Sequence, residues 1–167
     1  MASTGINISY FRFQLAFIFY LFLSVNLTAH SSDLTPKITY FYDGDTVKVK
    51  DAISEYKLRL TDIDAPERNQ TYGKAARRAL INLCENADVR VYIIGKDRYQ
   101  RNVGKLICNN QDASIYMIKN GHAWFNSRYS MDYTLDLAEQ DSRANQLGLW
   151  KQKKPIPPWI WRQKNPH

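Results

Sequence analysis

Arg59, Asp64 and Glu67 stand close together in the chain, and their types and spacing suit the hydrolysis of a phosphodiester. Two separated carboxylates can hold a hard metal ion such as Ca²⁺, and a third can take a proton from water. Guanidinium groups bind phosphate oxygens through paired hydrogen bonds and stabilise the charge of the transition state. The three residues follow an Asp43-Gly44-Asp45 turn, and Arg101 comes later. The chain therefore carries the side chains that cleavage of a nucleic acid requires.

Each of these residues also has an ordinary structural interpretation. Asp43-Gly44 is a common hairpin turn, and taken alone it indicates a turn more strongly than a metal site. Arg59 and Arg101, taken singly, could be surface arginines. An EF-hand is excluded, because its ladder of acidic positions and closing Glu are absent. Only the ordered set favours chemistry over structure.

Strands and helices must bring these side chains together. Residues 37–42, 46–50 and 56–60 show strand patterns and predict a three-stranded meander with Leu58 and Leu60 on one face and Arg59 on the other. The remaining predicted elements are a helix at 72–86, strands at 89–93 and 103–108, a short helix at 114–120 ended by Gly121, and a long helix at 134–147.

The last helix and the tail carry weaker patterns. In the long helix, Leu137, Ala138, Ala144 and Leu147 fall near one stripe, and Gly148 is expected to cap the C-terminus. The tail, residues 151–162, is rich in Pro and Trp and is expected to pack over the surface.

Composition indicates one folded domain with a basic surface. The chain has 167 residues, 44% of them hydrophobic, and a net charge of +7. This content supports a core rather than disorder, and the charge favours a nucleic acid as partner over a merely solvated surface. No stable protein partner is indicated, and we expect a monomer.

The N-terminus reads as a targeting segment. After Arg12 comes an apolar run of about a dozen residues, which is short for a membrane span of ~20. We expect residues 1–31 to be a secretory signal peptide, with an uncleaved N-terminal anchor as the alternative. The protein would then be secreted or periplasmic, or membrane-anchored in the alternative. Removal of 1–31 would delete one basic residue and no acidic one, so the basic character belongs to the remaining chain.

Two cysteines, Cys84 and Cys108, are present. In an exported protein an even count favours a disulfide, and two buried free thiols are the alternative. The three histidines are scattered and no C-x-x-C occurs, which argues against a structural zinc site.

Several separate segments, in one order, resemble the thermonuclease family, the staphylococcal nuclease-like domains. The matching segments are Asp43-Gly44-Asp45-Thr46-Val47, Arg59-Leu60 through Glu67, Tyr72-Gly73-Lys74-Ala75-Ala76, Asp97 through Arg101, Asn120-Gly121, Ala138-Glu139 and Gly148-Leu149-Trp150. The resemblance covers residues 35–162, which we take as the nuclease domain. It implies an α+β fold, a five-stranded OB-fold β-barrel with three helices, and an active site on the barrel rim.

The resemblance also implies roles for individual residues. Asp45, Asp64 and the backbone carbonyl of Ala65 would bind Ca²⁺, and Glu67 would be the general base or orient the attacking water. Arg59 and Arg101 would bind the scissile phosphate, and the products would carry 3′-phosphate and 5′-hydroxyl ends. Arg98, Tyr99 and Tyr129 would contact the nucleotide. The expected function is a secreted calcium-dependent nuclease acting on DNA, with RNA as a further candidate.

One position departs from the family pattern. Gln100 stands where the family usually has glycine, so a positive φ there would strain the turn by about 1–2 kcal/mol and put the placement of Arg101 in doubt. A non-catalytic OB-fold module that binds nucleic acid or protein is the alternative function. Retention of the whole acidic and arginine set argues against it.

Overall fold

A three-stranded meander opens the described part of the chain, residues 35–166 of this computed structural model. Strands β1 (Lys37–Phe41), β2 (Thr46–Lys50) and β3 (Glu55–Leu60) pair antiparallel in that order, as the sequence predicted. The expected signal peptide or anchor, residues 1–31, lies outside the described residues.

Two further strands complete the main sheet. Strand β3 pairs in parallel with β6 (Asn102–Cys108), which pairs antiparallel with β5 (Val89–Lys96). The resulting order, β1-β2-β3-β6-β5, is that of an OB-fold, and the predicted α+β class is confirmed. The short β7 (Gln111–Asp112) pairs antiparallel with the end of β6, and β4 (Ile63–Asp64) pairs antiparallel with β8 (Trp124–Phe125).

Strand alternation separates the core from the site. Leu58 and Leu60 are fully buried and pack with Val47 and Val49 of β2. Arg59, one residue out of phase, points to the opposite face. The hydrophobic burial of β2 and β3 therefore fixes the direction in which the Arg59 guanidinium leaves the sheet.

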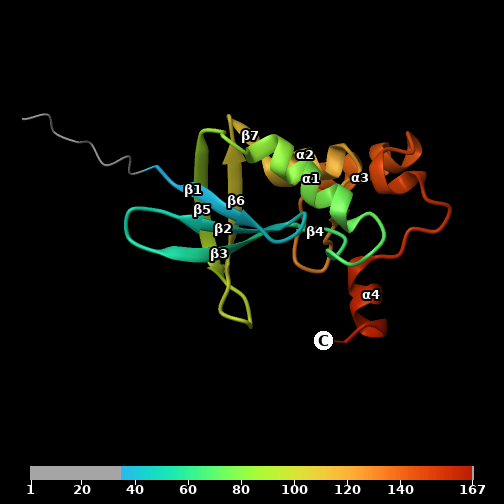
Figure 1. Ribbon diagram of the computed structural model, residues 1–167. Coiled ribbons are helices and arrows are strands. Elements are labelled where there is room, and N and C mark those ends of the chain that lie inside the picture. The colour runs from blue at the N-terminus through green and yellow to red at the C-terminus, as the bar shows by residue number, and fades with distance from the viewer. Residues whose placement is uncertain (1–34, 167) are drawn as a thin grey trace, which may run out of the picture. The chain divides into compact units, whose positions relative to one another are not determined.

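Helices α1 (Gly73–Cys84), α2 (Ala113–Lys119) and α3 (Tyr133–Ala144) lie to one side of the strands (Figure 1). A 3₁₀ turn, η1 (Gly148–Lys151), follows. The tail then forms a short helix, α4 (Pro158–Lys164), which lies apart from the other three near the C-terminal end (Figure 1). Within residues 35–166, no helix combines the length and apolar character needed to cross a membrane.

The long helix differs from its sequence prediction. It ends at Ala144 with Asn145 as C-cap, and Gly148 begins the 3₁₀ turn, so the predicted cap was wrong. The predicted stripe was also wrong, because Leu137 is exposed and the buried side chains are Leu135, Glu139 and Ser142. These two polar groups are buried with partners: Glu139 accepts from the Phe125 amide, and Ser142 accepts from Trp150 Nε1.

Candidate active site

Asp45 sits at the start of β2 and faces the turn that follows β4. It is 4% exposed, and its Oδ2 accepts a 2.6 Å hydrogen bond from the Ala65 amide while its Oδ1 accepts from the Thr46 hydroxyl. Gly44 permits this approach, since a Cβ there would lie 2.8 Å from the Ala65 Cβ and 2.9 Å from the Ala76 Cβ. The Asp-Gly turn thus packs against two segments and holds Asp45 beside Ala65.

Arg59 joins the two predicted metal ligands. Its Nη1 lies 3.2 Å from Asp45 Oδ2, and its Nη2 donates to Asp64 Oδ1 at 2.9 Å. Nη1 also donates to the Leu60 carbonyl. Asp45 and Asp64 therefore face a common point, as expected, with the Arg59 guanidinium between them.

Burial makes this pair of carboxylates unusual. Desolvation raises the pKa of Asp45 to about 7, although the Arg59 charge opposes the change. Desolvation also raises the pKa of Asp64, against the opposing effects of Arg162 and Arg59. For Arg59, burial alone would lower the pKa, but the charges of Asp45 and Asp64 raise it on balance. The site contains more buried negative charge than Arg59 alone can compensate.

Glu67 is joined to this pair by a residue that the sequence analysis did not identify. Arg162 of α4 donates from Nη1 to Glu67 Oε1 at 2.7 Å, and from Nη2 to Asp64 Oδ2 at 2.7 Å. Hydrogen bonding to Asp64 raises the pKa of Arg162. The five charged groups form one cluster of three carboxylates and two guanidiniums, here called the acidic cluster: Asp45, Arg59, Asp64, Glu67 and Arg162.

The loop after β4 and the tail helix place this cluster. Gly73 allows the loop to fold back, since a Cβ there would lie 1.8 Å from the Glu67 carbonyl oxygen. Gln70 donates from its side chain to the Ile156 carbonyl at 2.6 Å, which ties the loop to the segment before α4. The signal available in the sequence was Pro157-Pro158 before an aromatic segment, because proline favours the first turn of a helix.

Arg101 directly precedes β6, the strand that pairs with β3 and its Arg59, but Arg101 is not part of the acidic cluster. Its Nε donates to Asp97 Oδ2 at 2.7 Å, and the Asp97 Oδ1 accepts from the backbone amides of Arg101 and Tyr99. Burial alone would raise the pKa of Asp97, but these hydrogen bonds from Arg101 and Tyr99 lower it on balance. Asp97 therefore holds the Arg101 side chain through its Nε.

Gln100 adopts the conformation that the family glycine would favour. Its φ is 62°, in the left-handed region, and its amide donates to the Asp97 carbonyl at 3.0 Å. The turn keeps its hydrogen bonds, so Gln100 carries backbone strain without displacing Arg101 from Asp97. The backbone strain that the sequence predicted at Gln100 is present, but the contact between Arg101 and Asp97 is kept.

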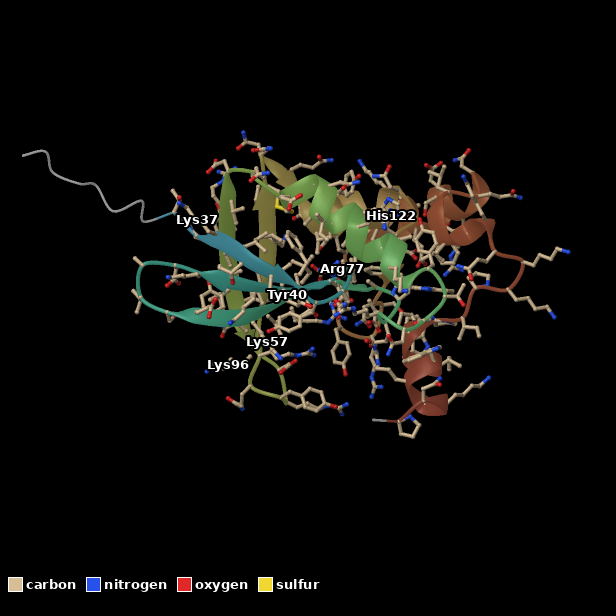
Figure 2. The ribbon with its side chains drawn as sticks, in the orientation of Figure 1. Lys37, Tyr40, Lys57, Arg77, Lys96 and His122 are labelled. Carbon is tan, nitrogen blue, oxygen red and sulfur yellow. A yellow bond between two sulfur atoms is a disulfide. The ribbon has the colours of Figure 1, made fainter. Side chains whose placement is uncertain are left out.

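A basic groove of about 470 Å³ adjoins Arg101. Its lining includes Lys57, Lys96, Tyr99 and Arg101, which come from β3, β5 and the turn between β5 and β6. Figure 2 shows Lys57 and Lys96 close together beside that turn. The Tyr99 ring is 65% exposed, with the Arg98 guanidinium 4.8 Å from its centroid. A cationic groove with an exposed aromatic ring suits a nucleotide.

The structure leaves Tyr129 outside this arrangement. Its side chain is 74% exposed, and its recorded ring contact is with the Arg128 guanidinium at 5.7 Å. Among residues 35–166, no recorded contact joins Tyr129 to the acidic cluster or to Arg101. Its predicted role at the nucleotide stays a prediction.

The donor set can be tested against Ca²⁺, which the resemblance implies. Within the described residues, no three His, Cys, Asp or Glu side chains lie close enough to enclose a metal by themselves. Asp45 and Asp64 nevertheless present two buried carboxylates to one point. Ca²⁺ commonly completes such a set with backbone carbonyls and water. The Asp45 and Asp64 carboxylates fit a hard cation, with solvent or substrate supplying further oxygens. The predicted role of the Ala65 carbonyl stays a prediction.

Away from the site, Cys84 at the end of α1 and Cys108 at the end of β6 are joined by a disulfide. Both residues are buried, and their Cα atoms lie 5.2 Å apart. The bridge fastens α1 to the sheet.

Comparison with known proteins gives consistent results. A family model described as "Staphylococcal nuclease homologue" matches residues 57–152. A protein named "Uncharacterized endonuclease" from Escherichia coli O157:H7 is 32% identical over 134 residues, 80% of this chain and 88% of that protein. A protein of the same name from Haemophilus influenzae is 34% identical, over 78% of this chain and 74% of its own. "Staphylococcal-like nuclease CAN1" from Arabidopsis thaliana is 35% identical over 65% of this chain and 34% of its length. Asp45 and Arg162 lie outside the segment that the family model matches.

Proposed function

Because this chain belongs to the staphylococcal nuclease homologue family, we propose that it is a calcium-dependent endonuclease that hydrolyses phosphodiester bonds in nucleic acid. DNA is the proposed substrate, and RNA is the second candidate. The observation that carries the proposal is the acidic cluster. In it Arg59 contacts both Asp45 and Asp64, and Arg162 bridges Asp64 and Glu67. A protein that only bound nucleic acid would have no need for three carboxylates at a phosphate site.

The proposed chemistry uses each residue in a defined way. Glu67 accepts a proton from the attacking water, which can reach it because its side chain is 25% exposed. Arg59 and Arg101 bind oxygens of the scissile phosphate and stabilise the negative charge that grows there. Arg101 also assists the leaving 5′-oxygen, so the products carry 3′-phosphate and 5′-hydroxyl ends.

A bound Ca²⁺ would polarise the phosphate and lower the pKa of a water beside it. Asp45, Asp64 and the Ala65 carbonyl would hold it, and its charge would compensate the buried carboxylates. Substrate phosphate approaching Arg59 must compete with those two aspartates for the guanidinium. If a cation held the Asp45 and Asp64 carboxylates, Arg59 would be available to phosphate.

The groove beside Arg101 would receive the nucleotide. Tyr99 offers an exposed ring for stacking, and Arg98, Lys57 and Lys96 offer positive charge. We further propose that the protein acts as a monomer and is exported by its N-terminal segment, with a membrane-anchored form as the alternative. N-terminal sequencing of protein recovered outside the cell distinguishes the two.

The deciding experiment is a metal panel with DNA and RNA substrates and analysis of the product ends. Cleavage with Ca²⁺ that stops on addition of EGTA and leaves 3′-phosphates supports the proposal. Salt-sensitive binding without cleavage, over both substrates and all metals, would instead favour the non-catalytic binding module.

A further inference from the structure

The C-terminal helix brings a third arginine into the site. Arg162 makes three hydrogen bonds there, to both carboxylate oxygens of Asp64 and to Oε1 of Glu67. Its terminal nitrogens are shared between the two acids, Nη1 at 3.2 Å from Asp64 Oδ1 and 2.7 Å from Glu67 Oε1. The ion pair between Lys48 and Glu55 joins two exposed side chains on the surface. The ion pair of Arg162 differs, because its partner Asp64 is only 3% exposed.

We propose that Arg162 is a positioning residue of the active site, whose guanidinium holds the Glu67 carboxylate at a fixed place beside Asp64. The inference rests on the proposed function, because it gives a role to the residue that orients the general base. Glu67 has a long side chain that is 25% exposed, and among residues 35–166 its recorded carboxylate contact is with Arg162 alone. Without that contact the carboxylate would sample several rotamers.

Contacts other than those of Arg162 also anchor α4. Pro158 is buried, and the Trp159 ring packs edge-on against Trp124 at 5.6 Å. Trp124 belongs to β8, where it pairs with Asp64 of β4. The aromatic contact therefore docks α4 on the strand pair that carries Asp64, and Arg162, one turn beyond Trp159, reaches the acids from a fixed helix.

The planar fork of arginine suits this geometry. One guanidinium can hold two carboxylates in parallel hydrogen bonds, whereas a lysine ammonium acts as a point charge. Groups that orient catalytic side chains in this way typically change activity by about 10- to 100-fold when removed. Arg162 also donates to both carboxylate oxygens of Asp64 and brings a positive charge beside them. Removing Arg162 should therefore favour binding of a cation by Asp64.

The test compares Arg162→Met, Arg162→Lys and a matched control, Lys164→Ala. Lys164 is an exposed cation on the same helix, so its removal changes the charge of α4 but not the cluster. Calcium affinity is measured by calorimetry without nucleic acid. kcat and KM are measured with a single-stranded DNA oligonucleotide at saturating Ca²⁺, and thermal unfolding is measured in EDTA.

For Arg162→Met we expect Ca²⁺ to bind about 3- to 10-fold more tightly and kcat to fall about 10- to 100-fold, with KM changed by less than about threefold. Arg162→Lys should keep the wild-type Ca²⁺ affinity and recover part of kcat. Lys164→Ala should match the wild type in both. Tighter cation binding with slower turnover is a combination that loss of structure does not produce.

Two results would overturn the proposal. A kcat for Arg162→Met within about twofold of wild type would mean that the guanidinium only fills the place of the cation. Weaker Ca²⁺ binding together with a lower unfolding temperature would mean that Arg162 merely docks α4. If the wild type cleaves neither DNA nor RNA, the proposed function fails, and the calorimetry still decides whether Arg162 acts on Asp64: unchanged Ca²⁺ affinity in Arg162→Met would overturn that link.

Discussion

Removing the Cys84–Cys108 disulfide, which joins α1 to β6, should lower the free energy of unfolding by an amount set by the length of the loop that the disulfide closes. Cys84 and Cys108 are 24 residues apart in sequence. The chain-entropy relation gives about 3.4 kcal/mol at 25 °C for a loop of that length. Since small domains are typically stable by about 5–15 kcal/mol, the bridge would supply a large share of the total.

A double-mutant cycle isolates this contribution. Cys84→Ala or Cys108→Ala each breaks the bridge and leaves a small void, so each should cost about 3.4 kcal/mol plus ~1 kcal/mol for lost packing. The double variant loses the bridge only once. The sum of the two single losses should therefore exceed the double loss by about 3.4 kcal/mol.

The assay is equilibrium unfolding in urea followed by tryptophan fluorescence, with thiol titration of the unfolded, unreduced wild type as a check. Additive single losses of about 1 kcal/mol each, together with two free thiols, would refute the reasoning. They would indicate that the two cysteines are buried thiols in solution, the alternative that the sequence left open.

Three further predictions concern the site. Gly44→Ala should cost about 1–3 kcal/mol in urea unfolding, because its Cβ would meet Ala65 and Ala76 at under 3.0 Å, whereas the control Gly95→Ala, with nothing within 4 Å, should be near neutral. Gln100→Gly should stabilise the protein by about 1 kcal/mol, because φ is 62° there, and Gln100→Ala should not; equal effects would contradict the strain. Since the pKa of Asp45 is raised from 3.8 to about 7, the folded state keeps a proton that the unfolded state has lost. Titration of Asp45 alone should therefore cost the cation-free protein on the order of 4 kcal/mol as the pH rises from about 4 to 7, a loss that Asp45→Asn should not show. Thermal unfolding in EDTA that shows the same pH dependence in the wild type and Asp45→Asn would contradict that assignment.

Local patterns predicted the five main strands and most helices, whereas the arrangement of the strands as an OB-fold barrel came from the resemblance to the family. Strand alternation in residues 56–60 correctly placed Leu58 and Leu60 in the core and Arg59 on the other face. These features depend on side-chain direction along one strand and on pairing of neighbouring strands, which a sequence can reveal. The resemblance to the family implied that Asp45 and Asp64 share a site, and both carboxylates contact the Arg59 guanidinium.

Features that depend on distant partners were missed. Glu139 and Ser142 are buried because they bond the Phe125 amide and Trp150 Nε1, and polarity alone assigned such positions to the surface. Arg162 lies 95 residues from Glu67 in the chain, and its helix begins at the second of two prolines and has no apolar stripe. The position of α4 depends on tertiary packing between Trp124 and Trp159, which no local sequence pattern reveals.

The most direct test of the proposed nuclease is single-turnover cleavage of a DNA oligonucleotide by the wild type and by Glu67→Gln, both at saturating Ca²⁺. Gln keeps the shape of the side chain and an oxygen for Arg162 but cannot take a proton from water. The account predicts wild-type cleavage that EGTA abolishes and a loss of about 10²-fold or more in Glu67→Gln, with DNA binding retained. Equal cleavage rates for the two proteins would contradict it.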